Sequence, residues 1–96
     1  FGSMEMTNSI VSNNSSDYGG GIYTWESSTT LTNTIISDNW ANKRGGGIDN
    51  NIGILTLVDS FIMNNGNSSL DCNNNFEGAV TLVGSSDIAD GSCNTR

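Results

Sequence analysis

The chain has 96 residues, which allow one small domain, and its 10 acidic residues against three Lys and Arg give a net charge of −7. Binding to nucleic acid needs clusters of Lys and Arg, and only Lys43 and Arg44 are adjacent, so we expect no nucleic-acid partner. No apolar run approaches the ~20 residues of a membrane-spanning helix, so we expect no insertion into a membrane.

The start of the chain stands outside the pattern that follows it. Phe1-Gly2-Ser3-Met4 resembles a remnant of a cloning vector, so residues 1–5 are interpreted as such a remnant or as an N-terminal edge. Residues 6–96 are expected to form a single domain. From Met6 onward, equivalent positions recur 25 or 26 residues apart, and a period of roughly 20–50 residues is typical of a solenoid.

The repeat divides the domain into about four coils, near residues 6–28, 29–53, 54–79 and 80–96. Each coil contains short alternating stretches rich in Thr, Ile and Val, which are typical of β-strands, and no window carries the apolar stripe of a helix. We predict three short strands per coil, which in the second coil contain Leu31, Ile36 and Ile48. Segments 15–18 and 40–44 are interpreted as variable loops. The pattern predicts an all-β parallel β-solenoid, or β-helix, in which each strand pairs with its counterpart one coil away.

Stacking in register predicts which side chains face the core. Three apolar columns are expected to point inward: Met6, Leu31, Leu57 and Val83; Val11, Ile36, Ile62 and Ile88; and Ile22, Ile48 and Cys72. Two columns of turn residues repeat beside them: Asn8, Asn33 and Asp59, and Asn14, Asn39 and Asn65. Asn tolerates a left-handed backbone and its amide can bond to the next Asn in the stack, so we predict a structural role for both columns.

Outward positions of the second strand form an unusual line. The residue before each inward one is Ile10, Ile35, Phe61 or Asp87, so three large apolar groups line up among Thr and Ser neighbours. One interpretation is that a loop or a neighbouring chain covers this line. The other is that it forms a binding stripe.

Four aromatic residues are expected in loops or at outward positions: Tyr18, Tyr23, Trp25 and Trp40. Aromatic rings have an apolar face that stacks on sugar rings, which makes a carbohydrate-binding surface one interpretation. The other interpretation is that these rings pack loops against the coil.

The two cysteines are 21 residues apart, a little less than one coil. Cys72 lies in an inward column and Cys93 reaches the same side one rung later, so their Cα atoms should lie close to the separation that a disulfide spans. We predict a Cys72–Cys93 disulfide, which implies an oxidising compartment. Two cysteines without histidine are too few ligands for zinc, so we expect no metal site and no cofactor.

The repeated motifs resemble those of a known group of bacterial surface proteins. Gly20-Gly21-Ile22 and Gly46-Gly47-Ile48 are similar to the GGA[ILV] motif of the polymorphic outer membrane proteins of chlamydiae, with Gly in place of Ala. Phe61-Ile62-Met63-Asn64 matches their FxxN motif, while the segment from Ile10 to Asn13 keeps the Asn but has Ile for Phe. The closing segments at 71–72 and 90–93 resemble the end of such a repeat region.

This resemblance implies a right-handed parallel β-helix of the pectate-lyase-like architecture. It also implies a secreted or cell-surface bacterial protein with a structural or adhesive role. A host-surface protein or a polysaccharide is the partner that we expect for such a protein. The resemblance carries over no catalytic residue. Our first hypothesis is therefore a non-catalytic β-helical segment of an extracellular protein.

The second hypothesis is a carbohydrate-active β-helix that binds or cleaves an acidic or neutral polysaccharide, because polysaccharide lyases and hydrolases share the pectate-lyase-like architecture. Lyases of that kind use an Arg or Lys base beside an acidic calcium cluster, whereas Lys43 and Arg44 lie in one expected loop without such a cluster. Asp49 and Asp71 are expected on neighbouring rungs, roughly 7–8 Å apart, which falls in the range of inverting glycosidases. Two acidic residues on an acidic surface are usually only solvated, so we expect no enzyme.

Ice binding through outward Thr ladders is the third hypothesis. Thr7, Thr32 and Val58 are expected to align, as are Thr30 and Thr56, and we expect the ladder to break at the third and fourth coils.

The first coil is expected to have an open end. It should expose Met6, Val11 and Ile22 together with unpaired strand edges, which are a known association hazard. We therefore expect either self-association through this end or a segment that caps it.

Overall fold

The computed structural model describes residues 2–67, 71–75, 79–89 and 92–93. Within these ranges the regular structure consists of β-strands alone. In chain order the strands are β1 (Gly2–Thr7), β2 (Ile10–Ser12), β3 (Ser15–Tyr18), β4 (Ile22–Trp25), β5 (Ser27–Thr32), β6 (Ile35–Ser37), β7 (Trp40–Arg44), β8 (Ile48–Asn51), β9 (Ile54–Val58), β10 (Phe61–Met63), β11 (Gly66–Asn67), β12 (Cys72–Asn75), β13 (Ala79–Val83) and β14 (Asp87–Ile88).

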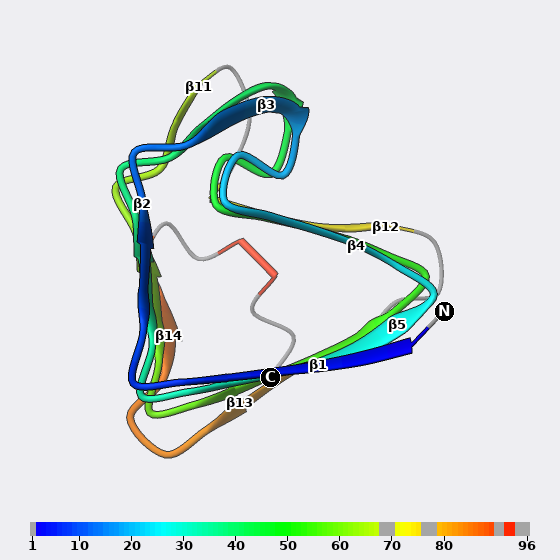
Figure 1. The fold of residues 1–96 in the computed structure, drawn as a ribbon, viewed down its shortest axis with the longest axis vertical. Coiled ribbons are helices and arrows are strands. Elements are labelled where there is room, and N and C mark those ends of the chain that lie inside the picture. Colours follow the sequence, from blue (N-terminus) through cyan, green and yellow to red (C-terminus); the bar gives the residue numbers. More distant parts are fainter. Residues whose placement is uncertain (1, 68–70, 76–78, 90–91, 94–96) are drawn as a thin grey trace.

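These strands form four parallel sheets that run along a stack of coils. We name them sheet A (β1-β5-β9-β13), sheet B (β2-β6-β10-β14), sheet C (β3-β7-β11) and sheet D (β4-β8-β12). Every pairing is parallel and joins a strand to its counterpart one coil away. Figure 1 looks down the stack from the first coil, and the chain runs clockwise as it recedes, which makes the coil right-handed. The predicted fold class, a right-handed parallel β-solenoid, is confirmed.

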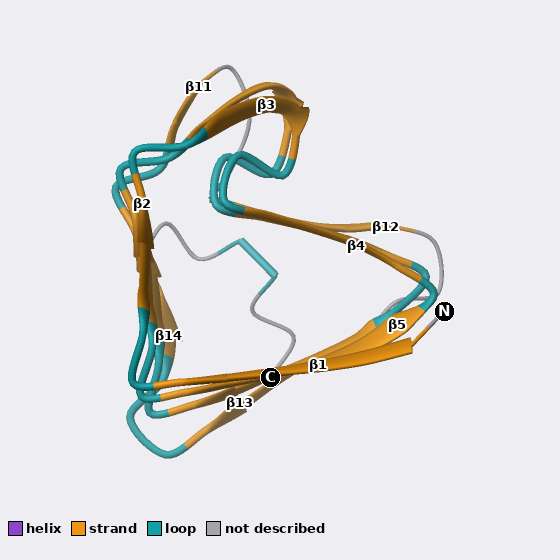
Figure 2. Ribbon diagram, viewed as in Figure 1, coloured by secondary structure: helices purple, strands orange, loops and turns teal. Residues whose placement is uncertain are grey.

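Each full coil has four strands rather than the three that we predicted. The additional strand is β3, β7 or β11 (Figure 2), and the first two of these occupy segments 15–18 and 40–44, which we had assigned to loops. Six of the nine residues in these segments are Ser, Asp, Asn, Lys or Arg, so the apolar alternation that identifies a half-buried strand is absent. Three coils carry all four sheets and the next adds only β13 and β14, so the stack has about three turns instead of four. The predicted coil boundary at 79–80 falls inside β13.

Residues 2–5, which we interpreted as a cloning remnant or an edge, belong to β1. They pair with Ser27, Ser28, Thr29 and Thr30 of β5 in the same register as the rest of the strand. The first coil therefore begins at Gly2 in the described chain, four residues before the predicted start at Met6.

The core is a narrow stack of like side chains. The second and third predicted columns are confirmed, running through Val11, Ile36, Ile62 and Ile88 and through Ile22, Ile48 and Cys72. The first column ends differently, because Leu57 pairs with Leu82 whereas Val83 pairs with Val58 and is 44% exposed. Placing Val83 in the core was wrong, since the last offset in sheet A is 25 residues and not 26.

Two polar ladders hold the corners on either side of sheet B. At one corner, Ser60 Oγ accepts a hydrogen bond from the backbone N–H of Thr34 at 3.0 Å and donates to the carbonyl of Leu31 at 3.0 Å. At the other corner, Asn39 Oδ1 accepts from the backbone N–H and the Nδ2 of Asn14. These side chains satisfy backbone groups that leave the sheets at the turns. The residues of the predicted column Asn8, Asn33 and Asp59 have φ angles of 50°, 51° and 49°, as a left-handed turn requires.

The glycine triplets at residues 19–21 and 45–47 turn the backbone inward between sheets C and D. We call each of these turns a glycine curl, and Figure 1 shows the first one before β4. Gly45 has a φ of +62°, and a Cβ on Gly20 would lie 2.3 Å from the carbonyl oxygen of Gly46 and 2.5 Å from that of Trp40. Glycine alone lets neighbouring coils approach this closely. The curl carries the end of β7 back toward the outer face of β8.

A disulfide closes the C-terminal end of the stack. Cys72 and Cys93 are bonded, with Cα atoms 5.8 Å apart, which confirms the predicted pairing. Ser92 Oγ accepts a hydrogen bond from the backbone N–H of Cys72 at 3.0 Å, and Cys93 packs against the core. Figure 1 shows residues 92–93, in red, inside the outline of the coil. These two residues therefore cover core side chains at that end.

Candidate functional site

The outer face of sheet D gathers two aromatic rings, an acid and an amide. Strand alternation places Ile22 and Thr24 of β4 inward, so Tyr23 and Trp25 point outward and are 45% and 59% exposed. On the next rung, Tyr23 pairs with Asp49 and Trp25 pairs with Asn51. The register of a single strand pair thus sets aromatic groups beside groups that form hydrogen bonds.

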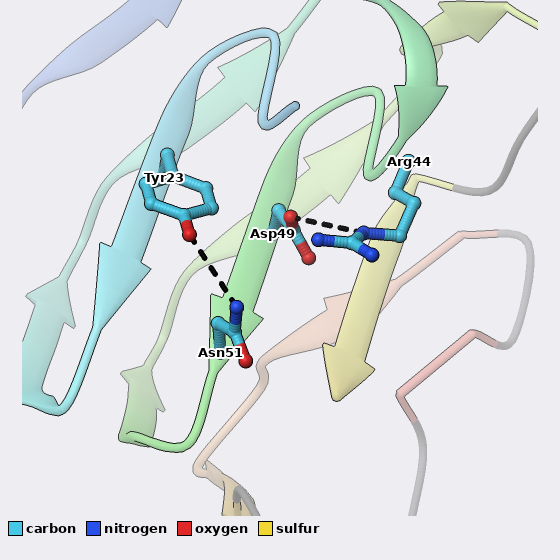
Figure 3. Close-up of polar contacts among 4 residues, drawn as sticks. All are labelled: Tyr23, Arg44, Asp49 and Asn51. Carbon is cyan, nitrogen blue, oxygen red and sulfur yellow. Dashed lines mark hydrogen bonds and ion pairs between the residues drawn. The ribbon is translucent and has the colours of Figure 1, made fainter. Parts of the chain in front are cut away.

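Arg44 completes this cluster from a neighbouring sheet. The glycine curl after β7 brings its Nε to 3.3 Å from Asp49 Oδ2, and Figure 3 shows the guanidinium beside the carboxylate. The guanidinium carbon also lies 4.5 Å from the ring centre of Tyr18. Asp49 is fully buried although it lies on an outer face, whereas the side chain of Arg44 is 38% exposed. The ion pair therefore neutralises a carboxylate that is shielded from water.

Asn51 contributes an acceptor without a partner. Its Nδ2 donates to the hydroxyl of Tyr23 at 3.4 Å, as drawn in Figure 3. Its Oδ1 is buried and is one of two such oxygens, with Thr29 Oγ1, that make no hydrogen bond to any residue that the structure describes. A buried polar atom without a partner is a natural contact point for a ligand or for water.

A shallow pocket of about 350 Å³ adjoins Tyr23 and Trp25 at the N-terminal end of the stack. Tyr23 and Trp25 line it together with Met4, Thr24 and Thr29. The unpartnered hydroxyl of Thr29 thus belongs to a residue of the pocket wall. Its lining also includes Ile22, so the pocket combines aromatic and apolar side chains with a few hydroxyl groups.

In the predicted pair, Asp49 and Asp71 are both buried, and each carboxylate contacts another residue of the chain. Asp71 is 4% exposed, and its Oδ1 accepts a hydrogen bond from the backbone N–H of Asn65 at 2.8 Å. Its carbonyl oxygen accepts from the N–H groups of Gly47 and Ile48, so the residue anchors the end of the glycine curl. Asp49 is bonded to Arg44.

Trp40 lies on a different face, the outer side of sheet C. It is 50% exposed, its Nε1 donates to Asn42 Oδ1 at 3.2 Å, and Asn42 Nδ2 donates to Asp17 Oδ1 at 2.9 Å. A Cβ on Gly66 would lie 2.9 Å from the ring of Trp40, so this indole covers the neighbouring rung. Trp40 and Trp25 therefore do not form one platform.

The predicted stripe Ile10, Ile35 and Phe61 is aligned on the outer face of sheet B, with Asp87 on the next rung. Its exposure falls along the stack, from 71% for Ile10 to 36% for Ile35, and Phe61 is half-buried. No described segment of the chain covers Ile10.

The sequence pointed to Tyr23, Trp25 and Asp49 separately but not to their grouping with Arg44 and Asn51. The 26-residue offset between Tyr23 and Asp49 was a usable signal, because it places them on one outward column. The contact of Arg44 with Asp49 could not be predicted, because residues 40–44 were interpreted as a loop and the position of Arg44 depends on the glycine curl.

Among residues 2–67, 71–75, 79–89 and 92–93, no group of three His, Cys, Asp or Glu side chains could hold a metal ion. A search of the same residues finds no helix with the length and apolarity needed to cross a membrane. No family model matches this chain, and comparisons with curated proteins and with solved structures likewise found no match.

Proposed function

We propose that this chain is a non-catalytic β-solenoid segment of a secreted or cell-surface bacterial protein, with a structural or adhesive role. The observation that carries the proposal is that both acids of the candidate catalytic pair, Asp49 and Asp71, interact with other residues of the chain. Asp49 is bonded to Arg44, and Asp71 accepts a backbone hydrogen bond from Asn65. A glycosidase needs one carboxyl group for the leaving oxygen and one for water or the sugar carbon, so the contacts of both acids within the chain support a non-catalytic role.

The extracellular location is supported by the disulfide between Cys72 and Cys93, which is compatible with an oxidising compartment. The resemblance of the Gly20-Gly21-Ile22 and Phe61–Asn64 motifs to those of chlamydial polymorphic outer membrane proteins supports a surface role. The pectate-lyase-like assignment is part of the same proposal and has the same support.

A polysaccharide is the partner that the cluster on sheet D favours. Tyr23 and Trp25 expose ring faces at neighbouring outward positions, and Asn51 offers a buried acceptor beside them. A sugar presents apolar C–H faces and hydroxyl groups together, which is the combination that aromatic rings with nearby polar groups bind. A host-surface protein is the alternative partner and would use the Ile10, Ile35 and Phe61 stripe.

A glycan array with the labelled chain tests this proposal. We expect binding to one or more polysaccharides that is lost in Trp25→Ala and kept in Ile10→Ala, which removes an exposed apolar side chain from another sheet. Binding that depends on Ile10 and not on Trp25 would move the adhesive surface to sheet B. Asp49→Ala is included to detect turnover, whose loss in that variant would contradict a non-catalytic role.

Self-association through the first coil is a further part of the proposal. Met4 is 36% exposed, Met6 and Val11 are half-buried, and β1 to β4 each have one edge that no described strand pairs. The opposite end carries the disulfide, so head-to-tail stacking is disfavoured and a two-fold, end-to-end pair is the expected dimer. Light scattering that reports a monomer at all concentrations would contradict this.

A further inference from the structure

The outer face of sheet A carries a regular array of short side chains. Its strands have five or six residues each and pair without interruption over four rungs. Three outward columns follow from the register: Ser3, Ser28, Ile54 and Ala79; Glu5, Thr30, Thr56 and Thr81; and Thr7, Thr32, Val58 and Val83. All twelve side chains are exposed or half-exposed.

The central column is more complete than the sequence suggested. We expected the Thr ladder to break at the third and fourth coils, but Thr30, Thr56 and Thr81 are direct partners on three successive rungs. The two flanking columns do lose their hydroxyl groups at these coils, because Ile54 and Ala79 follow Ser28 and because Val58 and Val83 follow Thr32. Valine has the same branched shape as threonine, so the shape of the Thr32 column is kept at the rungs where a methyl group replaces the hydroxyl group.

The geometry of this array is fixed by the backbone. Neighbouring rungs are ~4.8 Å apart, and alternate residues of one strand are about 6.6 Å apart, so the columns form a two-dimensional lattice. In Figure 1, which looks down the stack, β1, β5 and β13 each run nearly straight and fan out slightly from one another, so the lattice has a gentle twist. β-branched side chains are stiff at χ1, which keeps the hydroxyl and methyl groups in register.

The hydroxyls of the central column are free for contact with water or a ligand. Thr30, Thr56 and Thr81 form no hydrogen bond through their side chains with any residue that the structure describes. Glu5, on the first rung, is the one charged residue among the twelve, in a chain with a net charge of −7. Charged groups hold their own hydration shells, so their near absence leaves a face that can order water through hydroxyls and methyls together.

We infer that the outer face of sheet A binds ice. Ice is a planar, crystalline ligand whose oxygen atoms repeat in two directions at spacings of the same order as the rungs and alternate residues of this face. A rigid array loses little conformational entropy on contact, and many weak contacts in register then add up. A crystalline polysaccharide is disfavoured because the face has no aromatic ring on which a sugar could stack.

An ice recrystallisation assay on the 96-residue chain tests the inference. We expect the chain to keep ice grains small and Thr56→Lys to lose this effect completely, since Lys breaks the centre of the array. Ser37→Lys is the matched control, because Ser37 is an outward, half-buried residue of the same middle rungs on sheet B. It should retain the full effect. Thr56→Val removes one hydroxyl and keeps the shape, so it should fold and show a partial loss.

The inference would be overturned by a folded chain, with its disulfide intact, that leaves ice grains as large as an inert protein does. Equal losses in Thr56→Lys and Ser37→Lys would overturn it as well, since the effect would then not come from sheet A. Sedimentation with crystalline cellulose or chitin that depends on Thr56, without any effect on ice, would assign the face to a polysaccharide. None of these outcomes depends on the cluster around Tyr23 and Trp25.

Discussion

The side-chain oxygen of Asn65 accepts two hydrogen bonds from Asn39, one from its backbone N–H and one from its Nδ2, each at 2.9 Å. Asn39 repeats the arrangement one coil earlier, where its Oδ1 accepts from the backbone N–H and the Nδ2 of Asn14. Its Nδ2 also donates to the carbonyls of Val11 and Ser37 at 3.0 Å. One amide therefore ties three coils together at the corner between sheets B and C.

Replacing the central amide of this ladder should weaken the fold strongly. Asn39 is 1% exposed, and Asn39→Ala leaves several buried donors and acceptors without partners, at about 1–3 kcal/mol for each uncompensated group. We expect the free energy of unfolding in urea to fall by about 3 kcal/mol or more. Asn42→Ala is the control, because Asn42 is exposed, and its loss should be below about 1 kcal/mol. Equal losses in the two variants would contradict the role of the ladder.

Removing the disulfide should open the C-terminal end first. The chain-entropy model gives about 3 kcal/mol for a loop of this length, so Cys72→Ala with Cys93→Ala should lower the unfolding free energy by that amount. Hydrogen exchange should rise most in β12 and β13, which lie at the closed end of sheets D and A. Protection that falls uniformly along all three coils would show that the cystine does not act as a local cap.

The glycine curl should not tolerate a side chain where coils approach one another. A Cβ on Gly20 would lie far inside contact distance of two backbone oxygens, those of Gly46 and Trp40, so Gly20→Ala must push two coils apart. Such overpacking costs about 1–3 kcal/mol or more. Gly2→Ala has nothing within 4 Å and should unfold as the unaltered chain does. Thermal unfolding followed by circular dichroism separates the two variants.

Removing the cation of the buried ion pair should also destabilise the chain. Arg44→Met leaves the fully buried Asp49 without its guanidinium, and we expect a loss of about 1–3 kcal/mol in unfolding free energy. Lys43→Met, which removes an exposed cation next to it in sequence, should change stability by less than about 0.5 kcal/mol. Adding Asp49→Asn to Arg44→Met should restore part of the loss, and no recovery would contradict the electrostatic cause.

Periodicity made much of this fold predictable. Columns such as Val11, Ile36 and Ile62 could be read from the chain because a solenoid repeats one environment per coil, so a single offset assigns inward and outward positions. The Cys72–Cys93 disulfide could be predicted in the same way, because the period places both cysteines on one side of the coil on successive rungs. The error at Val83 shows the limit, since one residue fewer in the last turn moves Leu82 into the core and Val83 out.

The parts that could not be predicted depend on contacts rather than on the period. Strand β7 was missed because its polar sequence forms a strand through pairing with β3, and only Ala41 within it is buried. Arg44 reaches Asp49 only because the glycine curl reverses the chain between them. The engagement of Asp71 by the backbone of Asn65 likewise arises in three dimensions. The candidate site was therefore visible as separate residues and not as a cluster.

The absence of catalysis is the central functional claim, and a turnover assay tests it most directly. The 96-residue chain is incubated with the polysaccharides that it binds on an array, and new reducing ends and unsaturated products are measured over time. We predict binding that requires Trp25, with product formation no faster than in Asp49→Ala or in buffer alone. Turnover by the unaltered chain that disappears in Asp49→Ala would contradict the account.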